Sequence, residues 1–320
     1  SLSLSGRPIK NNCISGAKEF KMFNRQSMYL LIGAFLSTLL MVKSAVAQES
    51  VSQAADGVYK YAPGKGFNSM FVVTEEGVVV FDSANSEHAK GMLKAIRKIT
   101  EHPIRYVVQS HNHWDHAGGG QVFRDQGAKI IAHIEAYEWM KGNPHPDLAL
   151  PDEVWAGKHK NIELGGKTIE LHYLGMSHGL GMTLSILPEE KVTYIADIVT
   201  PNRVLFTIVP DFNINEWLRV LKDIEKMDFD TAIYSHSHAN ERLGNMQDVV
   251  LTREYIEDLQ AAVVAEFQKG TSFMEMPSKI KLEKYKDWVG YNEWLPMNAL
   301  RVMLDMWMGP YPWRPTPHYE

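Results

Sequence analysis

The six residues HNHWDH, at positions 111–116, place three imidazoles and one carboxylate in one short segment. Zinc in proteins accepts imidazole nitrogens and carboxylate oxygens, and a catalytic zinc keeps one further position open for water. In an extended segment His111 and His113 project to the same side, so they can share one ion. Asp115 and His116 follow beyond a turn and can address a second ion nearby. The segment therefore predicts a metal centre, and the three glycines after it allow the chain to turn away without covering the ions.

This segment cannot complete two metal sites alone, so further ligands are expected at the ends of later strands. Three residues qualify, because each follows a predicted buried strand: His178 in LGMSHGLGMT, Asp197 in YIADIV and His236 in AIYSHSHAN. Ligand sites in layered α/β folds gather at such connections. His238, two residues after His236, is an alternative ligand. Trp114, inside the segment, is expected to pack or to line the mouth of the pocket.

The order His-x-His-x-Asp-His, then His, Asp and His, resembles the metallo-β-lactamase superfamily over about residues 57–245. The resemblance implies an α/β fold, the four-layer αββα sandwich, with two zinc ions per chain. It assigns the first zinc to His111, His113 and His178, the second to Asp115, His116 and His236, and a bridging position to Asp197. Asp82, in VVVFDSA, matches the acidic residue that supports the ligand loop from behind in this family.

The implied chemistry is metal-dependent hydrolysis at a carbonyl carbon. Two zinc ions about 3.5–4 Å apart hold a water molecule and lower its pKa toward roughly 7, so that a hydroxide attacks the carbonyl. Asp115 is the predicted catalytic residue, because a carboxylate there can orient the nucleophile and later shuttle a proton. No Ser or Cys nucleophile is required. A lactone, an ester, a thioester or a β-lactam would each satisfy this chemistry.

The bridging position separates the alternatives within the family. Asp197 stands where the commonest zinc β-lactamases use Cys, and the only cysteine in the sequence is Cys13. An acidic bridge resembles glyoxalase II and acyl-homoserine lactonases, although Thr200 stands where the lactonases carry Tyr. A β-lactamase proper, acting on β-lactam antibiotics, remains an alternative. From another class, a non-haem iron oxidoreductase on the same fold could use the same ligands, and a binding protein could retain the site unused.

The predicted elements that position these residues repeat twice along the chain, each time as hairpins followed by strand-helix units. Hairpins are predicted around the turns at 75–77, 165–166 and 188–191, and helices at residues 87–100, 213–227 and 246–268. Both rounds contain buried apolar strands, so two sheets packed together with helices outside are expected. Residues 48–245 form the predicted hydrolase domain. Residues 246–320 form a helical C-terminal extension, rich in Trp and Met, which could dock on the core, act as a lid, touch lipid or mediate oligomerisation.

The N-terminal part is not predicted to belong to the fold. Residues 22–47 carry Arg25, an apolar run at 28–42 and a small-x-small site ending at Ala47, which is typical of a cleaved signal peptide. Residues 1–21 are interpreted as an upstream, non-native segment. The pattern predicts a periplasmic or secreted protein without a stable membrane span after cleavage. An uncleaved membrane anchor is the alternative.

The charge of the remaining chain limits its partners. Removing residues 1–47 takes six of the 33 basic residues and one of the 38 acidic residues, which leaves 27 basic and 37 acidic. A net charge near −10 repels phosphate backbones, so nucleic acid is excluded and a small-molecule substrate is expected. The remaining chain also lacks Cys, so neither a disulfide nor a thiolate ligand can contribute.

Overall fold

The computed structural model describes residues 51–309 apart from 65, 209–210 and 238–241. These residues belong to one compact unit, 49–320. The segment interpreted as a signal peptide and the alternative ligand His238 lie outside the described residues. Within the described part of the chain, no helix is both long enough and apolar enough to cross a membrane.

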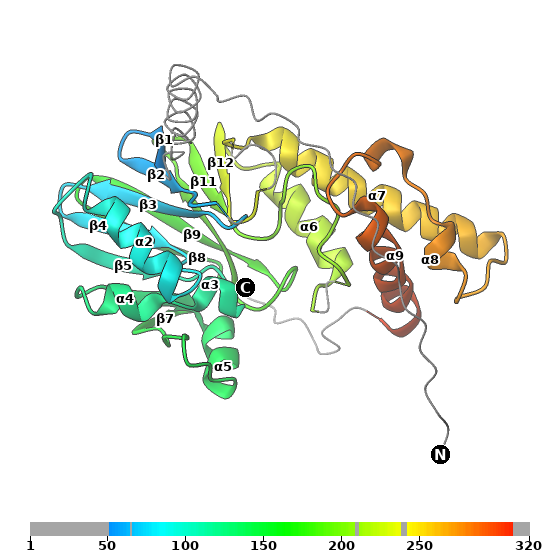
Figure 1. The fold of residues 1–320 in the computed structure, drawn as a ribbon, viewed down its shortest axis with the longest axis horizontal. Coiled ribbons are helices and arrows are strands. Elements are labelled where there is room, and N and C mark those ends of the chain that lie inside the picture. The colour runs from blue at the N-terminus through cyan, green and yellow to red at the C-terminus, as the bar shows by residue number, and fades with distance from the viewer. Residues whose placement is uncertain (1–50, 65, 209–210, 238–241, 310–320) are drawn as a thin grey trace, which may run out of the picture. The chain divides into compact units, whose positions relative to one another are not determined.

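Twelve strands are described, and they form two sheets (Figure 1). The first sheet has the order β1-β2-β3-β4-β5-β6-β7. Its strands are β1 (Val51–Ala55), β2 (Val58–Tyr61), β3 (Ser69–Thr74), β4 (Gly77–Phe81), β5 (Ile104–Val108), β6 (Lys129–His133) and β7 (Glu153–Trp155). The second sheet has the order β12-β11-β10-β9-β8. Its strands are β8 (His159–Leu164), β9 (Lys167–Gly175), β10 (Met182–Leu187), β11 (Val192–Ile195) and β12 (Thr231–Tyr234).

Helices cover the outer faces of both sheets. They are α2 (Ser86–Ile96), α3 (Trp114–Ala117), α4 (Gly120–Arg124), α5 (Ile134–Gly142), α6 (Ile214–Ile224), α7 (Met246–Gln268), α8 (Met276–Lys279) and α9 (Tyr291–Met308), with a 3₁₀ turn at Glu283–Tyr285. Asparagines precede three of them: the side chains of Asn85, Asn213 and Asn245 accept hydrogen bonds from the backbone N–H groups of the first turns of α2, α6 and α7. These caps satisfy N–H groups that have no partner inside the helix, so the sequence itself fixes where the helices begin.

Three apolar clusters hold the layers together. Phe71 and Met92 represent the cluster between the first sheet and helices α2 and α4. Val79 and Ile169 represent the cluster between the two sheets. The third, which includes Trp217 and Leu259, joins the second sheet to α6, α7 and the C-terminal helices. The predicted αββα sandwich with helices at the C-terminus is therefore confirmed.

The central strands of the first sheet are buried on both faces. All five residues of β4, Gly-Val-Val-Val-Phe, are buried, and β4, β5, β6 and β7 pair in parallel. Continuous β-branched runs are typical of parallel strands covered on both sides. The predicted hairpins and helices are present. Strands β1 and β2 precede the first predicted hairpin and were not predicted.

Candidate metal centre

The predicted ligands all follow the ends of strands. Asp82 follows β4, the HNHWDH segment follows β5, and His178, Asp197 and His236 follow β9, β11 and β12. In α/β sheets that contain parallel strands, such ends meet at one edge, where ligands bind. Residues separated by more than 100 positions in the sequence therefore lie together in one place.

The structure brings the seven predicted metal ligands into two groups. One group contains His111, His113, His178 and Asp197, and the other contains Asp115, His116 and His236; within each group the ligand atoms lie within 4.8 Å of one another. This is the division that the family resemblance implied. The segment itself is less extended than predicted, because Trp114–Ala117 forms the short helix α3. That helical turn separates Asp115 and His116 from His111 and His113.

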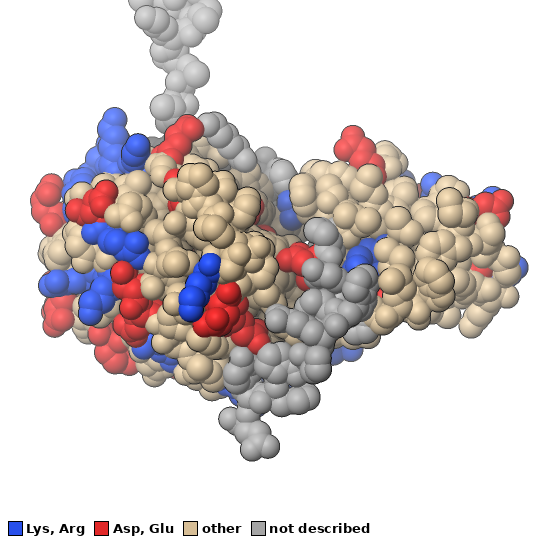
Figure 2. Space-filling view, turned by 90° about the horizontal axis from the view of Figure 1, so that it is seen from below, with Lys and Arg blue, Asp and Glu red and all other residues tan. Residues whose placement is uncertain are grey.

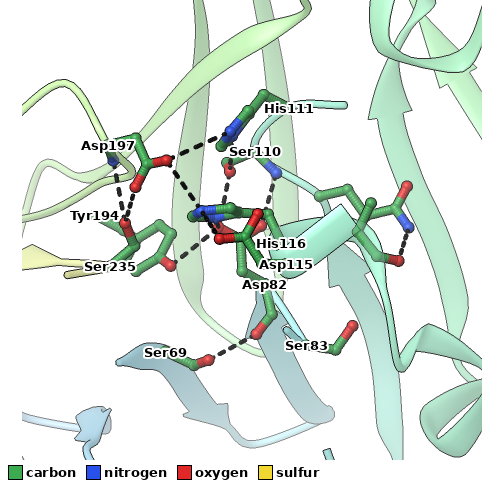
Figure 3. Close-up of polar contacts among 12 residues, drawn as sticks. Ser69, Asp82, Ser83, Ser110, His111, Asp115, His116, Tyr194, Asp197 and Ser235 are labelled. Atoms are coloured by element: carbon green, nitrogen blue, oxygen red, sulfur yellow. Dashed lines mark hydrogen bonds and ion pairs between the residues drawn. The ribbon is translucent and has the colours of Figure 1, made fainter. Parts of the chain in front are cut away.

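Asp197 lies between the two groups. Its Oδ2 is 2.9 Å from Nε2 of His178 and 3.2 Å from Nε2 of His116, and its Oδ1 is 3.0 Å from Nε2 of His236. Figure 3 shows this carboxylate facing both His111 and His116. The backbone at Asp197 has φ +53°, in the left-handed region, where Asp is among the few residues found with any frequency. One carboxylate therefore reaches both groups, as a bridging ligand must.

Asp82 organises the wall behind the histidines. This fully buried carboxylate accepts hydrogen bonds from the backbone N–H of Ser110 (2.8 Å), the Ser110 hydroxyl (2.7 Å) and the Tyr194 hydroxyl (3.0 Å). Its Oδ2 also lies 2.8 Å from Nδ1 of His116 (Figure 3). The prediction that Asp82 supports the ligand loop agrees with these contacts, whereas the roles of Ser110 and Tyr194 were missed because neither carries a sequence signal.

These contacts also fix which ring nitrogens are available to a metal. Because the Ser110 hydroxyl donates to Asp82, it must accept at 2.9 Å from the Nδ1–H of His111. Nδ1 of His116 donates to Asp82, and Nδ1 of His236 lies 3.2 Å from the Gly66 carbonyl. The Nε2 atoms of His111 and His116 are buried and make no well-aligned hydrogen bond among the described residues, and their nearest acceptor is the Asp197 carboxylate, 3.7 Å and 3.2 Å away. Buried polar atoms without partners are costly. The residues present therefore fit metal binding.

Burial and neighbouring charges shift the pKa values of the buried ligands. Burial lowers the pKa of His111 well below its usual value, and the neighbouring histidines add to that effect. Burial would also lower the pKa of His116, but Asp197, Asp115 and Asp82 outweigh it and hold that pKa well above its usual value. Burial would raise the pKa of Asp197, yet His116, His236 and His178 keep it well below its usual value. A cation that binds here must displace protons, so its affinity should fall on acidification.

His113 has a partner that the sequence did not reveal. Its Nε2 lies 2.5 Å from Oδ2 of Asp211, which belongs to the segment before α6. Burial would lower the pKa of His113, but the hydrogen bond and the charge of Asp211 outweigh it, and the pKa is raised. Asp211 orients the ring as carboxylates commonly orient metal-binding histidines. It follows no strand and belongs to no motif, so pattern reading could not find it.

The remaining predicted residues differ in their surroundings. The side chain of Asp115 is 63% exposed, with Oδ2 3.8 Å from Nε2 of His236 and 3.9 Å from Nε2 of His116, so solvent or a substrate can reach it. Trp114 is also exposed and stacks on the ring of His145 at a centroid distance of 4.4 Å. The stacking agrees with the expected packing role, whereas Trp114 is not among the residues that line the hollow beside His178.

Two glycines are required by close packing around the ligands. A Cβ on Gly179, which has φ +111°, would lie 3.2 Å from the rings of His111 and His113. A Cβ on Gly119, with φ +75°, would lie 2.4 Å from the backbone of Asn85. The glycine run after the HNHWDH segment thus lets α4 pack against the start of α2, in addition to turning the chain away from the site.

A small hollow of about 20 Å³, with room for about one water molecule, lies beside the ligands His178 and Asp197. Its other walls come from the segment 198–206, from Trp217 on α6 and from Thr252 on α7. The C-terminal extension holds that segment: the buried side-chain amide of Asn298 donates to the carbonyls of Leu205 (2.9 Å) and Thr207 (2.6 Å). Helix α9 is therefore structurally coupled to the wall of the site.

Comparisons with known proteins identify the architecture. The family model described as "Metallo-beta-lactamase superfamily" matches residues 64–236. The α subunit of 2,4-dinitroanisole O-demethylase from Nocardioides sp. (strain JS1661) is 26% identical over 172 residues, which are 53% of this chain and 52% of that protein. Metallo-beta-lactamase IND-1 from Chryseobacterium indologenes is 24% identical over 160 residues, 49% of this chain and 65% of that protein. The chain thus spans about half to two thirds of these relatives.

Solved structures share the fold at low identity. A metallo-beta-lactamase from Pontibacter korlensis matches with a TM-score of 0.56 and 18% identity, covering 65% of this chain and 98% of that one. The stereoselective inverting sec-alkylsulfatase Pisa1 from Pseudomonas sp. matches with a TM-score of 0.63 and 18% identity, covering 84% of this chain and 52% of that one. At such identities the likeness concerns the fold.

Proposed function

The chain belongs to the metallo-β-lactamase superfamily, and from this premise we propose that it is a zinc-dependent hydrolase that cleaves a lactone, ester, thioester or β-lactam. The observation that carries the proposal is the arrangement around Asp197: two groups of histidine and carboxylate ligands meet at this buried residue. The donors are nitrogen and oxygen only, a set that suits zinc.

The side chains present divide the work of hydrolysis. Zinc, when bound, would supply the activation of water and the polarisation of the carbonyl oxygen. Asp82 and Ser110 accept from the Nδ1–H groups of His116 and His111, so the Nε2 atoms of both rings point into the site, where a metal would displace any proton on them. Asp115, exposed beside His116 and His236, can accept a proton from the attacking water. It can return that proton to the leaving oxygen, sulfur or nitrogen when the bond from the carbonyl carbon breaks.

Two further functions are kept as outcomes of the test. A β-lactamase proper is favoured by the relatives with that name, one of which is 24% identical over 160 residues. A non-haem iron oxidoreductase would use the same ligand set, since imidazole and carboxylate also suit iron. The relative described as a demethylase subunit adds aryl methyl ethers to the substrates worth assaying.

The test combines metal analysis with a substrate panel. Protein purified without chelator is expected to contain close to two zinc ions per chain. Lactones, esters, thioesters, β-lactams, alkyl sulfates, phosphodiesters and aryl methyl ethers are then assayed with and without chelator. Hydrolysis of a carbonyl substrate that disappears with chelator and returns with zinc supports the proposal. Iron in place of zinc, or a phosphodiester with by far the highest chelator-sensitive kcat/KM, would overturn it.

We also propose that the substrate is a small molecule and that the protein acts in the periplasm or outside the cell. The excess of acidic over basic residues and the signal-like sequence at 22–47 support this proposal. Expression of the chain from Met22 in a Gram-negative host should give a mature protein that begins at Gln48. A protein that retains Met22 in the membrane fraction would instead indicate an anchor.

A further inference from the structure

Two histidines face each other across the hairpin at the edge of the second sheet. His159 of β8 and His172 of β9 are direct partners in the antiparallel register, and their Nδ1 atoms lie 3.1 Å apart. His159 is the first residue of β8, so the pair lies at the end of that strand away from the turn at 165–166. Neither residue belongs to the two ligand groups of the candidate metal centre. The pair is therefore a separate cluster of side chains that can bind metal.

A carboxylate fixes the proton on one of the two rings. Oε2 of Glu170 lies 2.9 Å from Nε2 of His172, and a carboxylate can only accept, so this nitrogen carries a proton. In its neutral form His172 then presents a lone pair at Nδ1, and His159 donates its Nδ1–H to that lone pair. One proton therefore fills the space between two imidazole nitrogens. A carboxylate behind a ring is also the common support of a metal-bound histidine.

The separation of the two nitrogens suits a metal ion. Imidazole nitrogen binds zinc at about 2.0–2.1 Å, so two nitrogens on one such ion lie about 2.9 Å apart at a right angle and about 3.3 Å apart at the tetrahedral angle. The observed 3.1 Å lies between these values. Residues directly opposite each other in an antiparallel pair project to the same face of the sheet. The backbone pairing of β8 and β9 therefore holds both donors in place before any ion arrives.

The proton between the rings can be displaced at neutral pH. Partial burial lowers the pKa of His159, and the neighbouring His172 adds to that effect against the charge of Glu170. His159 is therefore neutral at neutral pH. When a cation takes both Nδ1 atoms, the Nδ1 proton of His159 leaves for solvent and Nε2 of the same ring takes one up, so the ring stays neutral. The side chain of His159 is exposed, so water can exchange these protons.

The ligand atoms, rather than a charged surface, determine which ion is bound. Figure 2 shows Lys and Arg side chains interspersed with Asp and Glu side chains over the sandwich on the face in view. A surface of mixed charge does not by itself concentrate cations, so a bound ion must be held by its ligands. Two imidazoles favour Cu²⁺ over the other divalent first-row ions, because the affinity of a given nitrogen site is highest for copper.

We propose that His159 and His172 form a metal site distinct from the candidate metal centre, and that this site binds one Cu²⁺ ion through both Nδ1 atoms. Water completes the coordination of the ion, because His159 lies at the surface. Glu170 is a positioning residue, since it holds the ring of His172. The bound ion closes the edge hairpin at the end of β8 away from its turn. The site does not depend on the hydrolase function proposed above.

The test is copper binding by the full chain purified without chelator. Copper is added from a glycine-buffered solution, binding is followed by electron paramagnetic resonance, and zinc is measured in the same samples. The parent chain is expected to bind one copper ion more than the double variant His159→Gln/His172→Gln, and that ion should show two imidazole nitrogens in its spectrum. Each single variant leaves one imidazole, so it should bind this copper about tenfold more weakly.

Two further variants separate the site from general copper binding. His102→Gln is the matched control, because it removes an exposed histidine whose Nδ1 lies 2.7 Å from the Thr74 carbonyl, and it should bind copper as the parent does. Glu170→Gln keeps both imidazoles and should weaken the binding about tenfold, as the loss of such a support does elsewhere. Equal copper binding by the parent and the double variant would overturn the proposal, and so would a spectrum with a single nitrogen ligand. Circular dichroism of each variant confirms that it is folded.

Discussion

The two walls of the metal centre are built in different ways. The inner wall, defined by Asp82, Ser110, Tyr194 and His116, is fully buried, and each of its polar groups has a partner in the wall or faces the metal position. The outer wall contains Asp115, whose side chain is 63% exposed, and residues 200–207, which α9 holds through the hydrogen bonds of Asn298 to Leu205 and Thr207. The same site is therefore rigid behind the ligands and open in front of them.

This difference separates two tasks. The inner wall fixes tautomers and ring positions, so its side chains must satisfy one another without water. The outer wall meets solvent and substrate, so those of its residues that touch no ligand can change without breaking the metal position.

The largest effect is expected from Asp82→Asn. The backbone at Asp82 has φ +52°, which Asn tolerates, so the change removes charge without forcing the backbone. The new amide would face donors from Ser110, His116 and Tyr194, and leaving such buried partners unsatisfied costs about 3–5 kcal/mol. We expect the free energy of unfolding in urea to fall by that amount and the metal content to fall with it.

A matched control is Asp223→Asn, which removes an exposed carboxylate paired with Arg219 and Lys226. Exposed pairs contribute about 0–1 kcal/mol, so this variant should keep its stability and its metal. An Asp82→Asn protein as stable as this control would show that the inner wall is not the organising element.

The next largest effect is expected from the loss of one of the two proposed zinc ions. His236 belongs to the second ligand group, with Asp115 and His116. We expect His236→Ala to lower the zinc content by one ion per chain, measured by elemental analysis, and to lower activity with it. His238→Ala is the control and should retain both ions. A loss of zinc in the His238 variant instead would mean that the ligand assignment through SHSHAN is shifted.

The contrast between the walls also explains what the sequence could reveal. Strands such as β4 and β5 are continuous apolar runs, and candidate ligands follow them at once, so the gathering of the seven residues in two groups could be predicted. The αββα sandwich and the position of Asp82 were predicted from the family resemblance. Strands β1 and β2 were missed because β1 is only partly buried and β2 begins without an alternating pattern.

The residues of the outer wall could not be predicted from the sequence in the same way. Asp211 and Arg203 lie in a segment without repeats or motifs, and their positions depend on contacts with α9 and with the ligands. Asn298, which secures that segment, lies more than 90 residues further along the chain. Such contacts follow from the packed tertiary structure and from no local pattern.

A smaller effect is expected from Asp211→Asn. The amide can still accept a hydrogen bond from His113, but the charge that raises the pKa of His113 is gone. Loss of such a supporting carboxylate weakens metal affinity by roughly 10–100-fold. Zinc affinity measured by competition with a chromogenic chelator should show this change, while the urea midpoint stays close to that of Asp223→Asn. An unchanged zinc affinity would mean that Asp211 does not orient His113.

The smallest expected effect is a change of stability with pH that depends on His88, which lies behind the inner wall. The Ser69 hydroxyl donates to the backbone carbonyl of Asp82 at 2.7 Å, so it accepts at 2.8 Å from Nε2–H of His88. His88 also packs against the rings of Tyr61 and Phe67, and this burial lowers its pKa to about 4, against the opposing effect of Asp82.

A histidine with a lowered pKa in the folded state binds its proton more readily when the chain is unfolded. The unfolded chain gains that proton as pH falls below about 6.5, whereas the folded chain gains it near pH 4, so stability is lost between these values. At pH 5.5 the loss relative to neutral pH should be about 1 kcal/mol. His88→Gln can still donate to Ser69 and does not titrate, so its stability should fall less over the same range. Urea unfolding of both proteins at pH 7.5 and pH 5.5 measures the difference, and equal losses would show that His88 is solvated and takes no part in the inner wall.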